Sequence, residues 1–254
     1  MSRYTTRYKP RTAYWLMRFA DEAHDCEAAI KQKHRRKLHC FLAGEYHNVL
    51  GMKVADTQGF ILVNRHKHST YMVLSFRGSE MSWRMEGWRT NLSASLATAH
   101  WLKAGHEHLK AHHGFIRAYG DVHQEIISAV REVKPLRIYV TGYSLGAALA
   151  TLAAFHIQTK FPSIHVTMYS FASPYIGDLQ FAQVYNLTVP DSHRVVHDDD
   201  LVPKLRLLFD TNRRALIECS HVGQEHILPR HPHSKFPHHE RTYYLDQLKQ
   251  EAFR

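Results

Sequence analysis

The stretch Thr141-Gly142-Tyr143-Ser144-Leu145-Gly146-Ala147-Ala148 decides how the rest of the sequence is interpreted. It lies between a β-like run, 137–140, and a run of small residues, 147–155, that is typical of a helix packed closely on a sheet. A Gly-x-Ser-x-Gly turn between a strand and a helix holds its serine in a strained conformation, with the hydroxyl projecting from the sheet edge. The helix that follows directs free N–H groups and its positive end towards charge near Ser144. The sequence therefore predicts a nucleophilic serine at this turn.

The composition is that of an ordinary globular protein, with 44% hydrophobic and 22% charged residues in a chain of 254. A chain of this length can bury a sizeable core, and we expect a single domain over residues 1–254. The net charge is +10 with neutral histidines, and it is spread along the chain apart from one cluster at 31–37. On a helix this cluster indicates a solvated face. The functional alternative is an anionic lipid surface, and we expect no nucleic-acid partner.

The three cysteines, Cys26, Cys40 and Cys219, are too widely spaced for a metal motif or a disulfide framework. Residues 1–10 are polar and lack the apolar core of a signal peptide, and no window approaches eighteen consecutive apolar residues. We therefore expect a reduced, soluble protein without a transmembrane helix. Its expected location is cytoplasmic by default, or secreted by a signal-independent route, and its oligomeric state stays open.

Strand-like and helix-like runs alternate through the middle of the chain, which predicts a mostly parallel central sheet with helices on both faces. Before the serine turn, the patterns predict a helix over 11–38, a hairpin of strands 48–54 and 60–64 with a turn ending at Gly59, a strand over 71–76 and a helix over 116–133. After the turn, they predict a strand over 164–171, a helix near 179–185, a strand over 194–197, a strand pair within 215–227 bent at Gly223, and a helix from Glu240.

An amphipathic helix is predicted by Met81, Met85, Trp88 and Leu92, which recur at i, i+4, i+7 and i+11 with polar residues between them. Gly87 weakens the middle of this helix. It is either ordinary cover of the core or a mobile flap over an apolar site, and the spacing does not decide between the two.

A serine hydroxyl is a poor nucleophile at neutral pH and needs a histidine base, which in turn needs an acid to orient it. Three adjacent carboxylates, Asp198, Asp199 and Asp200, follow the strand-like run 194–197, and spacing alone does not choose among them. Weaker candidates, which do not directly follow such a run, are Asp178 and Asp210. Six histidines further along the chain are candidates for the base: His221, His226, His231, His233, His238 and His239.

The tetrahedral intermediate of such a reaction needs preorganised hydrogen-bond donors, typically two. The backbone N–H of Leu145 is the first, and a loop after an early strand supplies the second; Phe76-Arg77-Gly78-Ser79 lies at such a place. Histidine pairs at i, i+2 lack a supporting set of acidic or cysteine residues, so neither a metal nor another cofactor is expected.

Several blocks of the sequence occur in an order that carries a family resemblance. They are Phe76-Arg77-Gly78-Ser79, Trp88-Arg89-Thr90-Asn91-Leu92, His112-His113-Gly114-Phe115, the serine turn, and the segments 169–177, 194–203 and 239–245. Over roughly 71–248 the chain resembles the class 3 lipases, the family of filamentous-fungal triacylglycerol lipases. The resemblance implies an α/β-hydrolase fold, the chain order serine, acid, histidine, and a helical lid over roughly 81–105.

The resemblance also selects among the candidate residues. In the family the acid directly precedes an aliphatic-Val-Pro run, which implies Asp200, and the oxyanion-loop motif implies Ser79 as the second donor. A recurring His-Val-Gly strand is not the catalytic base, so His221 is set aside. The base shortly precedes Tyr-Leu, which implies His239 in preference to His238.

Three positions depart from the family pattern: Tyr143 stands where a His is usual, and Ala147 and Ala172 stand where a Gly is usual. None of these changes removes a catalytic group. We expect a serine ester hydrolase, a lipase that acts on acylglycerols at a lipid–water interface through a Ser-Asp-His triad and an acyl-enzyme. The alternatives are a phospholipase A1, a short-chain or feruloyl esterase, and a non-catalytic binding module on a hydrolase scaffold.

Overall fold

The computed structural model describes residues 7–25, 27–43, 47–49, 52–54, 57–66, 69–78, 96–99, 101, 106, 108–204, 207–210, 215–229 and 239–254. The expected lid residues Met81, Met85, Trp88 and Leu92 lie outside the described residues, as does Ser79. One described part of the expected lid segment, 81–105, forms a strand, β6 (Leu96–Thr98).

A mixed sheet forms the centre of the fold, and among the described residues its strand order is β1-β4-β5-β8-β9-β11-β14. The strands are β1 (Leu38–Ala43), β4 (Gln58–His66), β5 (Ser69–Phe76), β8 (Arg137–Tyr143), β9 (His165–Phe171), β11 (Ser192–His197) and β14 (Gln224–Leu228). Neighbouring strands from β5 to β14 are parallel, whereas β4 runs antiparallel to both β1 and β5. The prediction of a mostly parallel sheet is confirmed, and it brings the carboxyl ends of β5, β8, β9 and β11 to the same edge.

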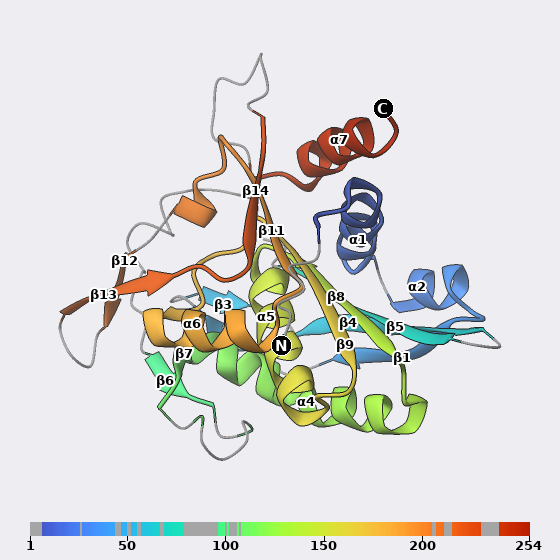
Figure 1. Cartoon of the computed structure of the whole chain (residues 1–254), viewed down its shortest axis with the longest axis horizontal. Helices are drawn as coiled ribbons and strands as arrows, with labels where there is room; N and C mark the ends of the chain where they lie inside the picture. The colour runs from blue at the N-terminus through green and yellow to red at the C-terminus, as the bar shows by residue number, and fades with distance from the viewer. Residues whose placement is uncertain are drawn as a thin grey trace.

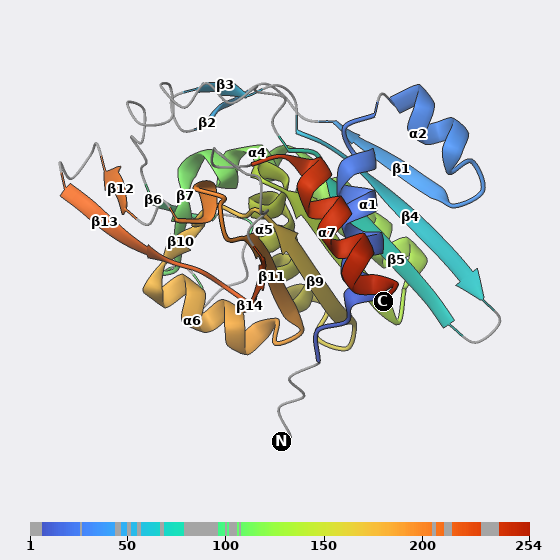
Figure 2. The ribbon, with the colours of Figure 1, turned by 90° about the horizontal axis from the view of Figure 1, so that it is seen from above.

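Helices cover both faces of this sheet (Figures 1 and 2). On one face, α1 (Pro10–Glu22) lies beside α7 (Arg241–Ala252), and on the other lie α4 (His113–Val133), α5 (Leu145–Lys160) and α6 (Leu179–Thr188). Alternate residues of β8 serve the two sides, because Ile138 and Val140 pack with α4 and α5 whereas Tyr139 and Tyr143 pack with α1 and α7. A strand buried on both faces is characteristic of a parallel sheet covered by helices.

Helix α5, which follows the serine turn, is buried on almost all sides from Gly146 to Ile157. It contacts β5, β8 and β9 on one side and α4 and α6 on the other. Small side chains at Ala147, Ala148 and Ala150, all fully buried, let the helix lie close to the sheet. A helix that is apolar all round is stable only in such a buried position.

The single helix predicted over 11–38 is wrong, because the chain turns after Glu22 and forms a second helix, α2 (Glu27–Lys33), before β1 begins at Leu38. The buried carboxylate of Glu22 is the physical reason. It contacts Lys33 Nζ at 2.5 Å and His34 Nε2 at 2.7 Å. In a straight helix, residues 22 and 33 would lie about 16 Å apart. These contacts therefore require α2 to fold back on the end of α1.

The predicted hairpin of 48–54 with 60–64 is also wrong. The first run divides into β2 (His47–Val49) and β3 (Met52–Val54), which pair with each other, and the second run belongs to β4. Gly59 lies within β4 and not in a turn. A Cβ at Gly59 would lie 2.5 Å from the carbonyl oxygen of Ser75, so glycine is required by the close approach of β5.

The strand pair predicted within 215–227 is also wrong, because the two strands in this range belong to different sheets. β14 joins the central sheet parallel to β11, whereas β13 (Ala215–Ser220) belongs to a second sheet of order β12-β13-β10-β7-β6 among the described residues. The remaining strands of that sheet are β12 (Leu207–Asp210), β10 (Gly177–Asp178) and β7 (Lys110–His112). The bend at Gly223 is confirmed by its φ of +76°. Of the helices that the structure describes, none has both the length and the apolar character needed to cross a bilayer.

Candidate active site

Ser144 lies between the end of β8 and the start of α5, at the carboxyl edge of the sheet. Its backbone has φ 55° and ψ −120°, a combination that is strained for any residue with a side chain. The N–H of Ser144 donates to the carbonyl oxygen of Phe171 at 2.9 Å, which anchors the turn to the neighbouring strand β9. The serine is thus held in the strained turn that the sequence predicts.

The two glycines of the turn permit backbone contacts that no side chain would allow. A Cβ at Gly142 would lie 2.2 Å from the carbonyl oxygen of Gly146, and a Cβ at Gly146 would lie 2.4 Å from that of Phe76. Because these neighbours are backbone atoms, they have little freedom to move. The turn is therefore packed directly on the last residue of β5.

Asp200 and His239, far apart in the sequence, are in direct contact. The Nδ1 atom of His239 lies 2.8 and 2.9 Å from the two carboxylate oxygens of Asp200. Asp200 is fully buried, and its carboxylate also accepts hydrogen bonds from the hydroxyl of Tyr244 at 2.7 Å and from the N–H of Val202 at 2.9 Å. These donors compensate for the loss of water around the buried carboxylate. With Asp200 accepting from Nδ1–H, the tautomer of His239 that can take a proton at Nε2 is favoured.

The structure distinguishes among the three adjacent carboxylates. Asp198 is exposed and lies 3.8 Å from the ammonium group of Lys204. The N–H of Asp199 donates to Nδ1 of His197. The carboxylate of Asp200 contacts Nδ1 of His239 directly.

Other candidates for the acid and the base have different partners. Asp178 caps α6 by accepting from the N–H of Phe181 at 2.8 Å. His221 contacts the carbonyl oxygen of Pro203 at 2.7 Å, and His226 contacts Glu251 at 3.0 Å. The candidates His231, His233 and His238 lie outside the described residues.

The ring of Tyr143 packs against the base, and Tyr244 packs against Tyr143. The ring of Tyr143 lies 4.9 Å from that of His239 at an interplanar angle of 41°, and 5.6 Å from that of Tyr244 at 78°. The hydroxyl of Tyr143 is buried without a hydrogen-bond partner among the described residues. Burial, followed by the negative charge of Asp200, raises the pKa of both tyrosines well above 10, so both stay neutral. The sequence patterns did not assign either ring a contact with the base.

A third contact that the sequence did not predict lies beside the turn. Nε2 of His24, which follows α1, accepts a hydrogen bond from the N–H of Gly78 at 3.2 Å. No pattern in the sequence connects these residues, which are separated by 54 positions.

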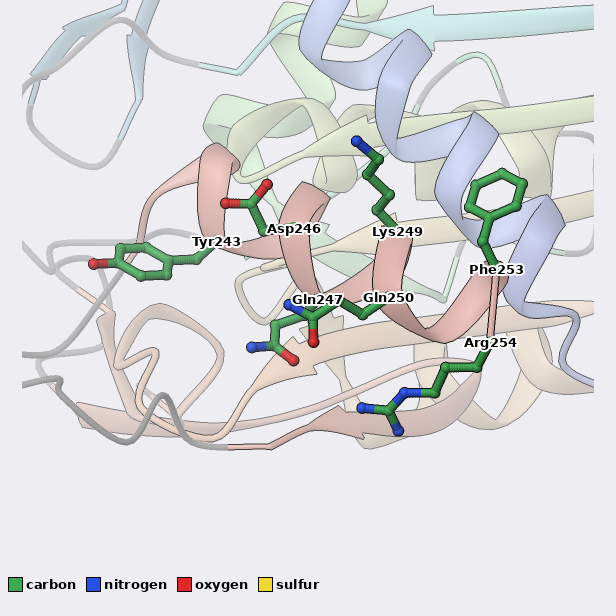
Figure 3. Close-up of a pocket in the computed structure, with 7 residues that line it drawn as sticks. All are labelled: Tyr243, Asp246, Gln247, Lys249, Gln250, Phe253 and Arg254. Carbon is green, nitrogen blue, oxygen red and sulfur yellow. The ribbon is translucent and has the colours of Figure 1, made fainter.

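Two cavities lie near these groups. One of about 340 Å³ borders Asp200 and is lined in part by Tyr175, Arg194, His197 and His221. A larger cavity of about 660 Å³ is lined by residues of α7 and the two that follow it (Figure 3): Tyr243, Asp246, Gln247, Lys249, Gln250, Phe253 and Arg254. Neither Ser144 nor His239 lines the larger cavity, so its size does not mark the chemical site. In the part of the chain that the structure describes, no group of three or more His, Cys, Asp or Glu residues is arranged to hold a metal ion.

The fold is that of the α/β-hydrolases, with the serine on the turn between a central parallel strand and its helix. The sequence model described as Lipase (class 3) matches residues 73–209. The chain belongs to the class 3 lipase family.

Curated relatives include the secreted mono- and diacylglycerol lipase A of Penicillium cyclopium, 34% identical over 160 residues that cover 61% of this chain and 48% of the relative. A chloroplastic phospholipase A(1) of Arabidopsis thaliana is 31% identical over 159 residues, covering 56% of this chain and 35% of the relative. The chain thus spans about half or less of the length of the curated relatives that it matches.

Solved structures agree over more of the chain. The Rhizomucor miehei triacylglyceride lipase matches with a TM-score of 0.61 at 20% identity, covering 85% of this chain and 78% of the other. A mutant form of the MDLA protein of Penicillium cyclopium matches with a TM-score of 0.59 at 26% identity, covering 88% and 81%. The structural similarity therefore extends beyond residues 73–209, the segment that the family's sequence model matches.

Proposed function

We propose that the protein is a serine carboxylic-ester hydrolase that acts on acylglycerols. The observation that carries this proposal is the direct contact between the buried carboxylate of Asp200 and Nδ1 of His239, in a fold that holds Ser144 in a strained turn. A buried acid that orients an imidazole is what a weakly nucleophilic hydroxyl requires.

In the proposed reaction, Oγ of Ser144 attacks the ester carbonyl while Nε2 of His239 takes its proton. Asp200 stabilises the imidazolium that forms, and His239 then returns the proton to the departing alcohol. Water hydrolyses the acyl-enzyme by the same proton transfers in reverse. The N–H of Leu145 and a donor from Ser79 stabilise the oxyanion, and each such donor is worth about 10²–10³ in kcat.

Acylglycerols are the favoured substrates because relatives of this chain are named mono- and diacylglycerol lipases. Phospholipids are the second candidate, supported by a relative named phospholipase A(1) and by the net charge of +10. In either case we propose that Met81, Met85, Trp88 and Leu92 form a lid that opens at a lipid–water interface. Because fungal relatives are named secreted, an extracellular location is favoured over the cytoplasmic one expected from the sequence.

Labelling with a fluorophosphonate probe tests the chemical class. We expect the wild-type chain to be labelled, and the Ser144→Ala variant to be unlabelled with its thermal midpoint preserved. Asp200→Asn and His239→Ala should each slow labelling by several orders of magnitude. Absence of labelling in the folded wild type would leave the binding-module alternative as the better account.

Hydrolysis rates across p-nitrophenyl esters of increasing acyl length, followed by dioleoylglycerol and phosphatidylcholine, test the substrate class. Preference for long chains and for the diacylglycerol supports the proposal. A faster rate on phosphatidylcholine would make the protein a phospholipase, and activity confined to short chains would make it an esterase.

A further inference from the structure

The end of helix α1 contacts several of the elements that carry the proposed catalytic groups. Among the described residues, the carbonyl oxygen of Leu16 accepts from the hydroxyl of Thr141 on β8 at 3.2 Å, and that of Phe19 accepts from Ser75 on β5 at 2.9 Å. In the last turn of the helix, Oδ1 of Asp21 lies 3.0 Å from Nε of Arg241, two residues after His239. The helix is therefore fixed to the serine strand, to the strand before the oxyanion loop, and to the segment of the base.

The contact between His24 and Gly78 lies at the centre of this arrangement. The N–H of Gly78 donates to Nε2 of His24 at 3.2 Å, and this sets the plane of the peptide that joins Arg77 to Gly78. On the other side, the N–H of Arg77 donates to the carbonyl oxygen of Gln58 at 2.8 Å. The backbone at the end of β5 is therefore hydrogen-bonded on one side to His24, which follows α1, and on the other side to β4.

The same short backbone packs directly on the serine turn. A Cβ at Gly78 would lie 2.7 Å from the carbonyl oxygen of Tyr143, the residue before Ser144. Gly146 is similarly close to Phe76. A small rotation of the peptide at Gly78 would therefore displace backbone that lies against the nucleophile. It would also change the direction in which the chain continues to Ser79.

From this geometry we infer that His24 is a positioning residue, which fixes the Gly78 peptide against the serine turn so that the oxyanion site is formed before substrate binds. The inference rests on the proposed hydrolase function. Because the N–H of Gly78 is committed to His24, it is not a donor to the substrate oxyanion, and that task falls to Leu145 and the residue that follows Gly78.

His24 is suited to this task because it stays neutral. Partial burial, and next the positive charges of Arg241 and Arg77, lower the pKa of His24 to about 3. A neutral imidazole keeps a lone pair on Nε2 for the Gly78 amide throughout the pH range in which a serine hydrolase operates. The carboxylate of Asp21 forms an ion pair with Arg241 at 3.0 Å, and the charge of Arg241 still lowers the pKa of His24.

Two substitutions separate the hydrogen bond from the space that the side chain fills. His24→Leu keeps a similar volume but removes the acceptor, whereas His24→Gln places an amide oxygen close to the position of Nε2. With a soluble p-nitrophenyl ester we expect kcat to fall about tenfold in His24→Leu with KM changed less than twofold, and to recover to within threefold of wild type in His24→Gln. Asp25→Asn, an exposed change in the same turn, should leave kcat unchanged.

A reversible boronic acid inhibitor, which forms a tetrahedral adduct with Ser144, gives a readout that simple loosening of the fold would not produce. Its affinity should fall in His24→Leu by the same factor as kcat, while the thermal midpoint changes little. Equal kcat values for His24→Leu and wild type, or equal losses in the Leu and Gln variants, would overturn the inference.

Amide hydrogen exchange at Gly78 tests the contact independently of catalysis. Exchange should be faster in His24→Leu than in wild type, and close to wild type in His24→Gln. If wild type hydrolyses no ester but the exchange result holds, the proposed function fails and the structural contact stands. If wild type is active and exchange at Gly78 is unchanged in His24→Leu, the inference about His24 fails and the function stands.

Discussion

Removing the hydroxyl of Tyr244 should destabilise the protein strongly, whereas removing the hydroxyl of Tyr143 should not. Both rings lie within the group formed with His239, and Tyr→Phe is the smallest change that each allows. The hydroxyl of Tyr244 donates to the carboxylate of Asp200 at 2.7 Å and accepts from the N–H of His197 at 2.9 Å. The hydroxyl of Tyr143 is buried with no partner among the described residues.

The magnitude follows from the burial of the partners. Tyr244, Asp200 and His197 are all fully buried, so water does not replace the lost hydroxyl. A hydrogen bond to a charged group contributes about 1.5–3 kcal/mol, and the loss of the bond from the buried amide of His197 costs about 1–3 kcal/mol more. We expect Tyr244→Phe to lower the free energy of unfolding by about 3–5 kcal/mol. Tyr143→Phe should be neutral or raise it by about 1 kcal/mol, because the buried hydroxyl forms no bond to lose.

Urea unfolding of both variants and wild type, followed by tryptophan fluorescence, measures the difference directly. The initial rate on a soluble ester should fall less than tenfold in Tyr244→Phe where the protein is still folded, because Nδ1 of His239 keeps both contacts with Asp200. If the two variants unfold at the same urea concentration, the hydrogen-bonded group around Asp200 does not stabilise the fold as argued. A large loss of stability in Tyr143→Phe would equally refute it.

Three further predictions concern the turn, a helix and the response to acid. Gly146→Ala should abolish fluorophosphonate labelling, because the added Cβ would lie 2.4 Å from the carbonyl oxygen of Phe76. Gly120→Ala in α4 is the control, because a Cβ there meets nothing within 4 Å. This control substitution should raise the free energy of unfolding by about 0.5–1 kcal/mol. Lys134→Gly at the end of α4 should raise the free energy of unfolding by about 0.5–1 kcal/mol, measured by urea unfolding, because this exposed residue has φ 50° and glycine adopts that conformation without strain. Lowering the pH below 6.5 should destabilise the fold. Burial lowers the pKa of several histidines in the folded chain, so below pH 6.5 these histidines bind protons in the unfolded chain but not in the folded one. Two of these histidines are buried: His112, with a pKa of about 4, and His156, with a pKa of about 3. At pH 5 each of them lowers the free energy of unfolding by about 2 kcal/mol. The thermal midpoint should therefore fall steadily between pH 6.5 and 4.5. A midpoint that is constant over this range would show that these imidazoles are accessible to protons in the folded state.

The parts of the fold that were predictable from sequence are those in which each residue's environment is set by its immediate neighbours along the chain. The strand before Ser144 and the small-residue helix after it belong to this class, because Ile-Tyr-Val in β8 and the run of small apolar residues in α5 favour these elements locally. The break after Glu22 does not, since it depends on contacts of Glu22 with Lys33 and His34 that form only once the chain has turned. Gly59 was misread as a turn for the same reason. Its requirement for glycine comes from β5, the adjacent strand.

The candidate site divides in the same way. Spacing left three adjacent carboxylates open, and it was the family resemblance that selected Asp200 and His239, which the structure brings together. Tyr244 lies within the block that carried the resemblance, but its hydrogen bond to Asp200 joins residues that are 44 positions apart, so no local pattern predicts it. His24 lies outside every block, so no local pattern connects it with Gly78.

The residue before the nucleophile shows how a departure from the family pattern acquires a physical meaning once the fold is known. The sequence has Tyr143 where a His is usual, and the structure packs this ring against His239 at 4.9 Å. A histidine there would put a second titratable imidazole against the base, and the two would share their protonation steps. Tyr143 avoids this, because its pKa lies well above 10 and it stays neutral whenever His239 can act as a base. The substitution therefore places a neutral ring beside His239, whose Nδ1 contacts the carboxylate of Asp200.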